Sequence, residues 1–313
     1  MTESTQTAGA GRADNLRLGV AVILVTDLAL SLGDAAIKAF STDFVLWQIF
    51  VLRSVIALPV LFFIIRLYAE GTPLMPRRAG WVALRSLMLT GMWIAYWAAL
   101  PNLALGIAAA VYYTLPIFIV LFAALFIGDR IGTLGWIAAF VGFAGVLLIL
   151  RPDAGGFNAY ALLPLASAIL YALAMILTRT KCRDEHPLIL SFSLNVSFIA
   201  VGLLATLLIA ATGAPSGDDP SSASFLAGAW APMGGSEWLS MALLAAAAII
   251  GSIGAAIAYQ VAPPATIAIV DFVYLGFSAL WGVLFFAESL DLITIAGMVL
   301  IVIAGVAAVR RKA

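Results

Sequence analysis

Charged residues are scarce in this chain. Asp, Glu, Lys and Arg make up 10% of its 313 residues, whereas soluble domains carry roughly 25%. Hydrophobic residues make up 64%, and the mean hydropathy is +1.12. The short alternating segments of a membrane β-barrel are also absent. The composition therefore excludes a soluble globular protein and predicts an all-α integral membrane protein.

Cysteine and histidine are nearly missing as well. The single Cys182 and the single His186 share the loop TKCRDEHP, and two ligands on one short loop do not fill the tetrahedral shell of a zinc site. The catalytic patterns HExxH and GxSxG do not occur. We therefore expect an ordinary free thiol, no metal, no cofactor and no enzymatic activity.

Ten apolar runs, each about as long as a bilayer-spanning helix, are present instead. They cover residues 18–38, 45–66, 80–99, 103–127, 133–150, 160–179, 188–211, 240–260, 265–287 and 291–309. The first run is too long for the apolar part of a signal peptide, so we expect it to remain as a helix.

The basic residues predict the orientation, because Lys and Arg are retained in the cytoplasm. If ten runs span and the N-terminus is inside, 13 of the 16 basic residues lie at the cytoplasmic side. These are Arg12, Arg17, Arg66, Arg77, Arg78, Arg85, Arg130, Arg179, Lys181, Arg183, Arg310, Arg311 and Lys312. We expect both termini inside, and a flexible extracytoplasmic loop over 212–239, which has no Lys or Arg.

An internal repeat divides the chain. The segment FAGVLLILR (143–151) aligns with IAGVAAVRR (303–311), and each half contains five runs. An odd number of spans makes the second copy enter the membrane from the opposite side, which predicts inverted repeats. The expected layout is a disordered cytoplasmic tail (1–17), a first repeat (18–151), a connector (152–159), a second repeat (160–309) and a basic cytoplasmic tail (310–313).

These halves resemble the EamA repeats of the drug/metabolite transporter superfamily over about residues 18–310. The resemblance lies in the acidic motifs GDR (128–130) and AES (287–289), the Gly-rich fifth helices, Pro116 in the fourth helix and Arg53 in LRS. The second half has Asn195 and Leu275 at the positions of Arg53 and Pro116. The resemblance implies a bacterial inner-membrane carrier, often an exporter of amino acids. Ten-helix members include aromatic amino acid exporters and vitamin, nucleoside and S-adenosylmethionine carriers.

Charged residues inside spans are expensive, about 2.5–3.5 kcal/mol each on insertion scales, and are functional by default. Asp27, Asp34 and Arg53 lie at similar depth. They either meet the amine and carboxylate of an amino acid or form a structural pair between the first two helices. Asp34 and Lys38, four residues apart, are predicted to form an ion pair. A desolvated acid here also raises the hypothesis of proton coupling.

Residues 111–118 read VYYTLPIF, and Pro116 breaks the helical hydrogen bonds at mid-membrane, where polar groups or cavity water must replace them. The repeat aligns this stretch with VDFVYLGF (270–277), where Gly276 provides backbone freedom. The alternative is an ordinary kink with lipid-facing aromatics. The side chains predicted to face a cavity are Tyr112, Tyr113, Asp271 and Tyr274.

Three large rings in the third run, Trp93, Tyr96 and Trp97, share one helix face. They either stack on the substrate or belong to an interfacial aromatic belt. Further candidates for substrate binding are Tyr171, Asn195 and Trp281. Small residues around Gly254 and Gly145 predict close helix packing.

The sequence therefore predicts a secondary transporter that exports small polar metabolites, amino acids including aromatic ones first, by alternating access about Pro116 and Gly276. The alternatives are a carrier or importer of another metabolite, or proton-coupled drug efflux. The expected partners are a small-molecule substrate and the lipid bilayer, with no nucleic acid, and the chain acts as a monomer or homodimer.

Overall fold

The computed structural model describes residues 15–40, 43–69, 71–127, 133–150, 158–212, 222–262, 267 and 270–309, and every regular element among them is helical. The first group of helices is α1 (Leu16–Phe40), α2 (Leu46–Tyr68), α3 (Ala79–Ala99), η1 (Leu100–Asn102), α4 (Leu105–Tyr112), α5 (Leu115–Ile127) and α6 (Thr133–Leu150). The second is η2 (Ala159–Ala161), α7 (Leu162–Thr180), α8 (Pro187–Thr212), α9 (Ser222–Ala227), α10 (Gly235–Val261), α12 (Val273–Phe286) and α13 (Leu292–Val309).

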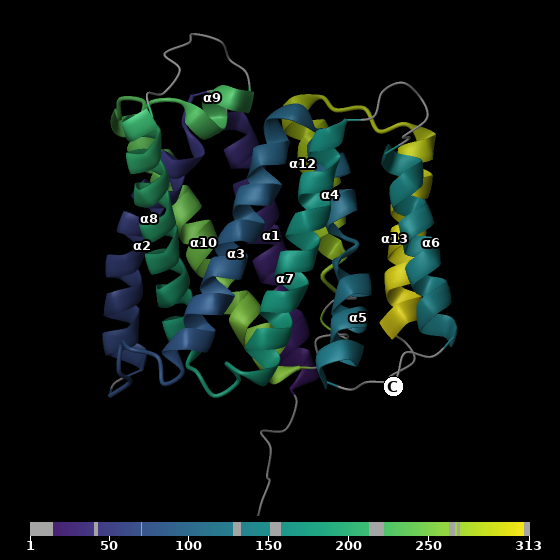
Figure 1. Cartoon of the computed structure of the whole chain (residues 1–313), viewed down its shortest axis with the longest axis horizontal. Coiled ribbons are helices and arrows are strands. Elements are labelled where there is room, and N and C mark those ends of the chain that lie inside the picture. Colours follow the sequence, from purple (N-terminus) through teal and green to yellow (C-terminus); the bar gives the residue numbers. More distant parts are fainter. Residues whose placement is uncertain are drawn as a thin grey trace, which may run out of the picture.

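The helices run roughly parallel to one another and form one bundle (Figure 1). Seven helical segments of the described chain are long and apolar enough to cross a membrane, and shorter apolar helices lie within α6, α12 and α13. Each of the ten predicted runs contains one of these helices or, in the fourth run, the pair α4 and α5. The prediction of a helical membrane protein is confirmed.

The packing joins helices from the two halves of the chain. The most extensive contacts are α6 with α13, α1 with α10, α2 with α8, and α3 with α7. Smaller ones join α1 to α12 and α5 to α7. The start of α1 and the end of α13 lie at the same edge of the bundle (Figure 1).

Glycines permit the closest of these contacts, as the sequence predicts. A side chain at Gly254 of α10 would overlap the hydroxyl of Thr26 on α1. A Cβ added to Gly145 of α6 would lie 2.8 Å from the carbonyl oxygen of Gly297 on α13. Backbones approach this closely only where small residues face one another, so these glycines pack helices within one chain.

The fourth run is broken where the sequence predicts weakness. Tyr113 and Thr114 form a turn between α4 and α5, and Pro116 is the second residue of α5, where its missing N–H removes no helical hydrogen bond. The hydroxyl of Thr114 donates to the carbonyl oxygen of Val111 (2.9 Å). A side-chain hydroxyl therefore satisfies part of the broken backbone.

The corresponding break in the second half lies at Asp271 and Phe272, which form a turn before α12. Gly276, the predicted hinge, lies four residues further on, inside α12. The structure thus places the second backbone interruption beside an acidic side chain rather than at the glycine.

The segment between α8 and α10, predicted to be a flexible loop, contains α9 in its described part. The indole of Trp47 on α2 donates to the carbonyl oxygen of Leu226 (2.6 Å), and the amide of Gln48 makes two hydrogen bonds with the backbone of Ala231 (2.7 and 2.9 Å). The described residues 222–231 are therefore fastened to the start of α2.

The predicted ion pair between Asp34 and Lys38 is wrong. Lys38 Nζ pairs with Glu288 Oε1 at 2.8 Å and donates to the carbonyl oxygen of Leu103 (2.6 Å). Glu288 also accepts the N–H of Leu105 (2.8 Å), at the start of α4. Spacing on the helix favoured Asp34, but Lys38 sits in the last turn of α1 and reaches a carboxylate that follows α12.

Candidate functional site

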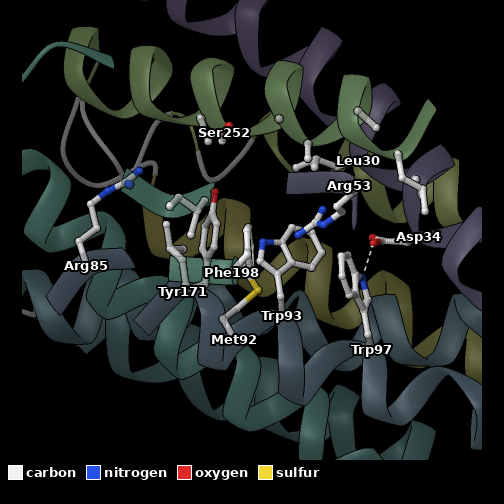
Figure 2. A pocket seen from close by; sticks show the side chains of 18 of the residues that line it. Leu30, Asp34, Arg53, Arg85, Met92, Trp93, Trp97, Tyr171, Phe198 and Ser252 are labelled. Atoms are coloured by element: carbon white, nitrogen blue, oxygen red, sulfur yellow. Dashed lines mark hydrogen bonds between the residues drawn. The ribbon is translucent and has the colours of Figure 1, made fainter. Parts of the chain in front are cut away.

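Two adjoining cavities lie inside the bundle, between α1, α3, α7 and the helices around them. The first, here called the arginine cavity, contains two buried guanidinium groups, those of Arg53 and Arg85 (Figure 2). It is also lined by Leu30, Gly33, Asp34, Leu89, Met92, Trp93, Trp97, Tyr171, Met175, Leu194, Phe198, Leu244, Ala247, Ala248, Gly251, Ser252 and Ala255.

Arg53 on α2 is held by aromatic rings rather than by a carboxylate. Its Cζ lies 4.4 Å from the ring centre of Phe198, 4.7 Å from that of Trp97 and 5.4 Å from that of Phe50. Its Nε and Nη2 are buried without a hydrogen-bond partner. The ring faces stabilise the cation, and the unpartnered N–H groups remain available to an anionic ligand.

Asp34 on α1 receives two hydrogen bonds from aromatic side chains. The Trp97 indole donates to its Oδ1 (2.8 Å), and the Tyr274 hydroxyl donates to its Oδ2. The same indole lies beneath Arg53, so one tryptophan contacts both charges. Asp34 and Arg53 therefore lie in one cavity and contact the same tryptophan, without forming a direct ion pair.

The second cavity, here called the tyrosine cavity, contains two carboxyl groups. It is lined by Thr26, Asp27, Leu30, Met92, Trp93, Tyr96, Tyr112, Tyr113, Tyr171, Asp271 and Tyr274. Leu30, Met92, Trp93 and Tyr171 also line the arginine cavity, so the two spaces are neighbours.

The side chains of Asp27 and Asp271 line the same cavity and interact with each other there. The Tyr259 hydroxyl donates to Asp271 Oδ2 (3.1 Å), while Asp27 Oδ2 is buried without a hydrogen-bond partner. Two carboxylates in contact repel one another, so such a pair is stable when it shares one proton or faces a cation. The pair joins α1 to the break before α12.

Tyr112 stands at the centre of a ring cluster. Its ring centre lies 5.3 Å from that of Tyr96, 5.9 Å from Tyr171 and 6.4 Å from Tyr274. Tyr113 stacks on Tyr274 with centres 5.2 Å apart. The tyrosines that flank the predicted helix break are buried inside the bundle rather than facing lipid.

Most of the side chains predicted from the sequence meet in these two cavities. Eleven of the thirteen line one or both: Asp27, Asp34, Arg53, Trp93, Tyr96, Trp97, Tyr112, Tyr113, Tyr171, Asp271 and Tyr274. Asn195 and Trp281 line neither. Asn195 donates to the Ser191 carbonyl of its own helix (3.0 Å), and the Trp281 indole donates to Ser31 (3.1 Å).

Arg85 is the main residue that the sequence reasoning misplaced. The pattern of basic residues predicts that it lies at the cytoplasmic side, yet only 1% of its surface is exposed and it lines the arginine cavity. Arg85, Leu89, Met92 and Trp93 follow one another at helical spacing on α3, on the face that also presents Trp97. That periodicity was the available signal.

Metal ligands do not gather in the part of the chain that the structure describes, where no three His, Cys, Asp or Glu side chains form a group that could hold an ion. Cys182 is a free, buried thiol. Burial raises its pKa, while the nearby Arg85 acts in the opposite direction.

Comparison with known proteins agrees with this architecture. Residues 17–151 match the EamA-like transporter family. The chain is a membrane transporter whose first half resembles the EamA-like transporter family. It is also 25% identical over 300 residues to a protein named pseudopaline exporter CntI from Pseudomonas aeruginosa strain UCBPP-PA14, covering 96% of this chain and 98% of that one. The predicted resemblance to EamA-like transporters is thereby confirmed, and the chain is a multi-pass protein of the bacterial inner membrane.

Two further proteins match a shorter part of the chain or match it at lower sequence identity. A riboflavin transporter from Rhizobium johnstonii is 39% identical over 95 residues, 30% of each chain. A solved crystal structure shares the fold with a TM-score of 0.64 at 22% sequence identity, covering 93% of this chain and 98% of the other. At that identity the likeness shows the fold alone.

Proposed function

We propose that this transporter exports small amphoteric metabolites, with amino acids first and aromatic ones included, by alternating access. Export, substrate class and the roles of single residues are parts of this proposal. It rests on one observation above all: a buried acid and a buried, hydrogen-bond-poor guanidinium in the same aromatic cavity.

The charges in the arginine cavity suit the two ends of an amino acid. The unpartnered N–H groups of Arg53 can bind a carboxylate, and guanidinium–carboxylate bonds are among the strong ones. Asp34 can accept a hydrogen bond from a substrate ammonium group in addition to those from its two existing donors, since a carboxylate offers about four acceptor positions. Trp93, whose ring centre is 4.9 Å from that of Trp97, supplies an apolar wall for the side chain.

Ten spans in two inverted halves, with both termini cytoplasmic, remain the proposed topology. The packing supports it. In two equivalent halves α1 corresponds to α7, α2 to α8, α3 to α10 and α6 to α13. The contact of α1 with α10 then has its counterpart in the contact of α7 with α3, and α2 with α8 and α6 with α13 are contacts between corresponding helices. Lys38 at the end of α1 bonds the Leu103 carbonyl after α3, as Arg179 at the end of α7 bonds the Gln260 carbonyl near the end of α10. Alternation between two related halves is the common mechanism of such carriers.

Proton coupling is assigned in this proposal to Asp27 and Asp271. The two carboxyls lie next to the helix break before α12, and the tyrosine cavity adjoins the cavity that would hold the substrate. Gaining or losing the shared proton changes the repulsion between α1 and that break. A proton movement could thus favour one conformation over the other.

A second candidate is a flat aromatic substrate such as riboflavin. The specific observation in its favour is the row of rings shared by the two cavities, since Trp93 contacts both Trp97 and Tyr96. The riboflavin transporter from Rhizobium johnstonii matches 30% of this chain. A ligand of this kind would stack on rings and need Arg53 less than an amino acid would.

Counterflow in liposomes tests both candidates. Purified protein is reconstituted, loaded with unlabelled compound and given the labelled one, with a panel of neutral, aromatic and acidic amino acids, riboflavin and pseudopaline. We expect saturable exchange of amino acids that requires Arg53. Empty liposomes and the variant Arg66→Gln, which changes an exposed basic residue at the end of α2, are the controls.

Exchange of riboflavin alone would replace the first candidate by the second. Correctly folded protein that exchanges none of these compounds would remove both candidates and leave the transporter family standing.

A further inference from the structure

Arg85 is a second buried cation, far from the first. It lies in α3 with 1% of its surface exposed, and its Nε donates to the hydroxyl of Thr178 on α7 (2.6 Å). That hydroxyl in turn donates to the carbonyl oxygen of Ala174 (2.8 Å). The guanidinium is therefore held in a fixed orientation by a neutral partner.

The charge of Arg85 is not balanced by a carboxylate. Its Nη1 is buried without a hydrogen-bond partner. The ion pair of Lys38 with Glu288 lies elsewhere. The titratable side chains that act on Arg85 are those of Tyr171 and Cys182, a phenol and a thiol that are neutral in their ordinary forms. A buried, unpaired guanidinium is costly, and the arrangement is expected where a ligand supplies the missing anion.

The position of Arg85 separates it from the Asp34–Arg53 end of the same cavity. Trp97 comes twelve residues after Arg85 on α3, a rise of roughly 18 Å along a helix. Figure 2 shows Arg85 at one end of the labelled side chains and Asp34 with Trp97 at the other, with Tyr171, Met92 and Trp93 between them. All of these residues line the arginine cavity.

We propose that Arg85 binds a second, remote carboxylate of the substrate, so that the preferred cargo is an elongated amphoteric metabolite. This inference rests on the proposed function, because it takes the Asp34–Arg53 end as the site of the amino-acid group. The apolar and aromatic walls between the ends suit an unbranched or ring-bearing linker. Short acidic amino acids such as glutamate do not reach from one end to the other.

A matched pair of ligands tests the assignment. 2-Aminosuberate and 2-aminooctanoate have the same eight-carbon chain and the same amino-acid end, and differ in the far carboxylate. Binding of each to the purified protein is measured by calorimetry, and each is tested as a competitor in counterflow. We expect 2-aminosuberate to bind at least about tenfold more tightly than 2-aminooctanoate, as a charge-assisted hydrogen bond implies. Glutamate should gain little affinity from its second carboxylate, because that group does not reach Arg85.

Variants of Arg85 then separate this role from a structural one. Arg85→Gln should bring the ratio of the two affinities close to one while leaving 2-aminooctanoate binding unchanged, and Arg85→Lys should restore part of the preference. Arg66→Gln, at an exposed basic site, should keep the full ratio. If Arg85→Gln does not fold, the comparison rests on Arg85→Lys and on the wild-type ratio.

Two results overturn the inference, and they differ. Equal affinity of the wild-type protein for the two ligands would remove the second carboxylate site while leaving the amino-acid end in place. Absence of binding by both ligands would remove the proposed amino-acid function together with it.

Discussion

Exchanging Arg53 and Asp34 for neutral residues, singly and together, decides whether the pair serves the substrate or the fold. The variants are Arg53→Met, Asp34→Asn and the double variant. Methionine keeps an unbranched, polarisable chain among the rings of Phe50, Trp97 and Phe198. Asparagine keeps the size of Asp34 and one acceptor oxygen for its two donors, Trp97 and Tyr274.

The expected coupling follows from the geometry around Trp97. Its indole N–H donates to Asp34 at 2.8 Å, and its ring centre is 4.7 Å from Arg53 Cζ. The two charges lie against the same indole and interact electrostatically. Opposite charges roughly 7 Å apart attract by about 2 kcal/mol at an effective dielectric constant near 20. Each single variant loses this attraction, and the double variant loses it only once.

Stability and transport should therefore respond differently. We expect the double variant to be more stable than the sum of the single losses predicts, by about 2 kcal/mol. Its apparent affinity for amino acids should nevertheless stay as low as that of Arg53→Met, at least about tenfold below wild type, because the contact with the substrate carboxylate is missing. Thermal unfolding in detergent and counterflow in liposomes measure the two quantities.

Rescue of transport would refute this reasoning. If the double variant unfolded like the wild type and also exchanged amino acids with wild-type affinity, the pair would be a structural bridge between α1 and α2. The alternative left open by the sequence would then be correct.

Three further perturbations test other parts of the molecule. Pro116→Ala should let α4 and α5 join across the turn at Tyr113 and Thr114, which would lower the maximal exchange rate and leave the apparent affinity unchanged; an unaltered rate would exclude a hinge there. Asp27→Asn should make transport indifferent to an imposed pH gradient, because the carboxyl pair could no longer share its proton, and a retained gradient dependence would place coupling elsewhere. Gly145→Leu should destabilise the α6–α13 contact by about 1–3 kcal/mol, the usual cost of overpacking, whereas Gly80→Ala, with open space around it, should not; equal melting temperatures would contradict the close approach to Gly297.

The sequence predicted the helices and much of the site because both depend on periodicity within single helices. Apolar runs of membrane length identified every long helix, and charges or tyrosines at mid-run identified Asp27, Asp34 and Tyr112. The acid of Asp271 was found through the internal repeat alone. These signals need no knowledge of how the helices are arranged.

Partners across helices could not be predicted in the same way. Helical spacing gave Lys38 the partner Asp34, yet Glu288, 250 residues away, is the one it meets. Arg85 was assigned to the interface from its place near the end of a run, although its neighbour Thr178 comes from the other half of the chain. Such choices depend on packing between distant segments.

The two halves share a framework and differ in charge, and this difference bears on mechanism. Lys38 and Arg179 each donate to a backbone carbonyl, one in each half, and in the proposed mechanism these bonds support the alternation between two related shapes. Arg53 has no charged counterpart, because Asn195 at the aligned position is bonded within its own helix. A carrier of this kind needs equivalent hinges in both halves to alternate between its two states. It needs only one set of charged residues to bind its substrate. The residues at which the repeats diverge are therefore the ones that should decide what is carried.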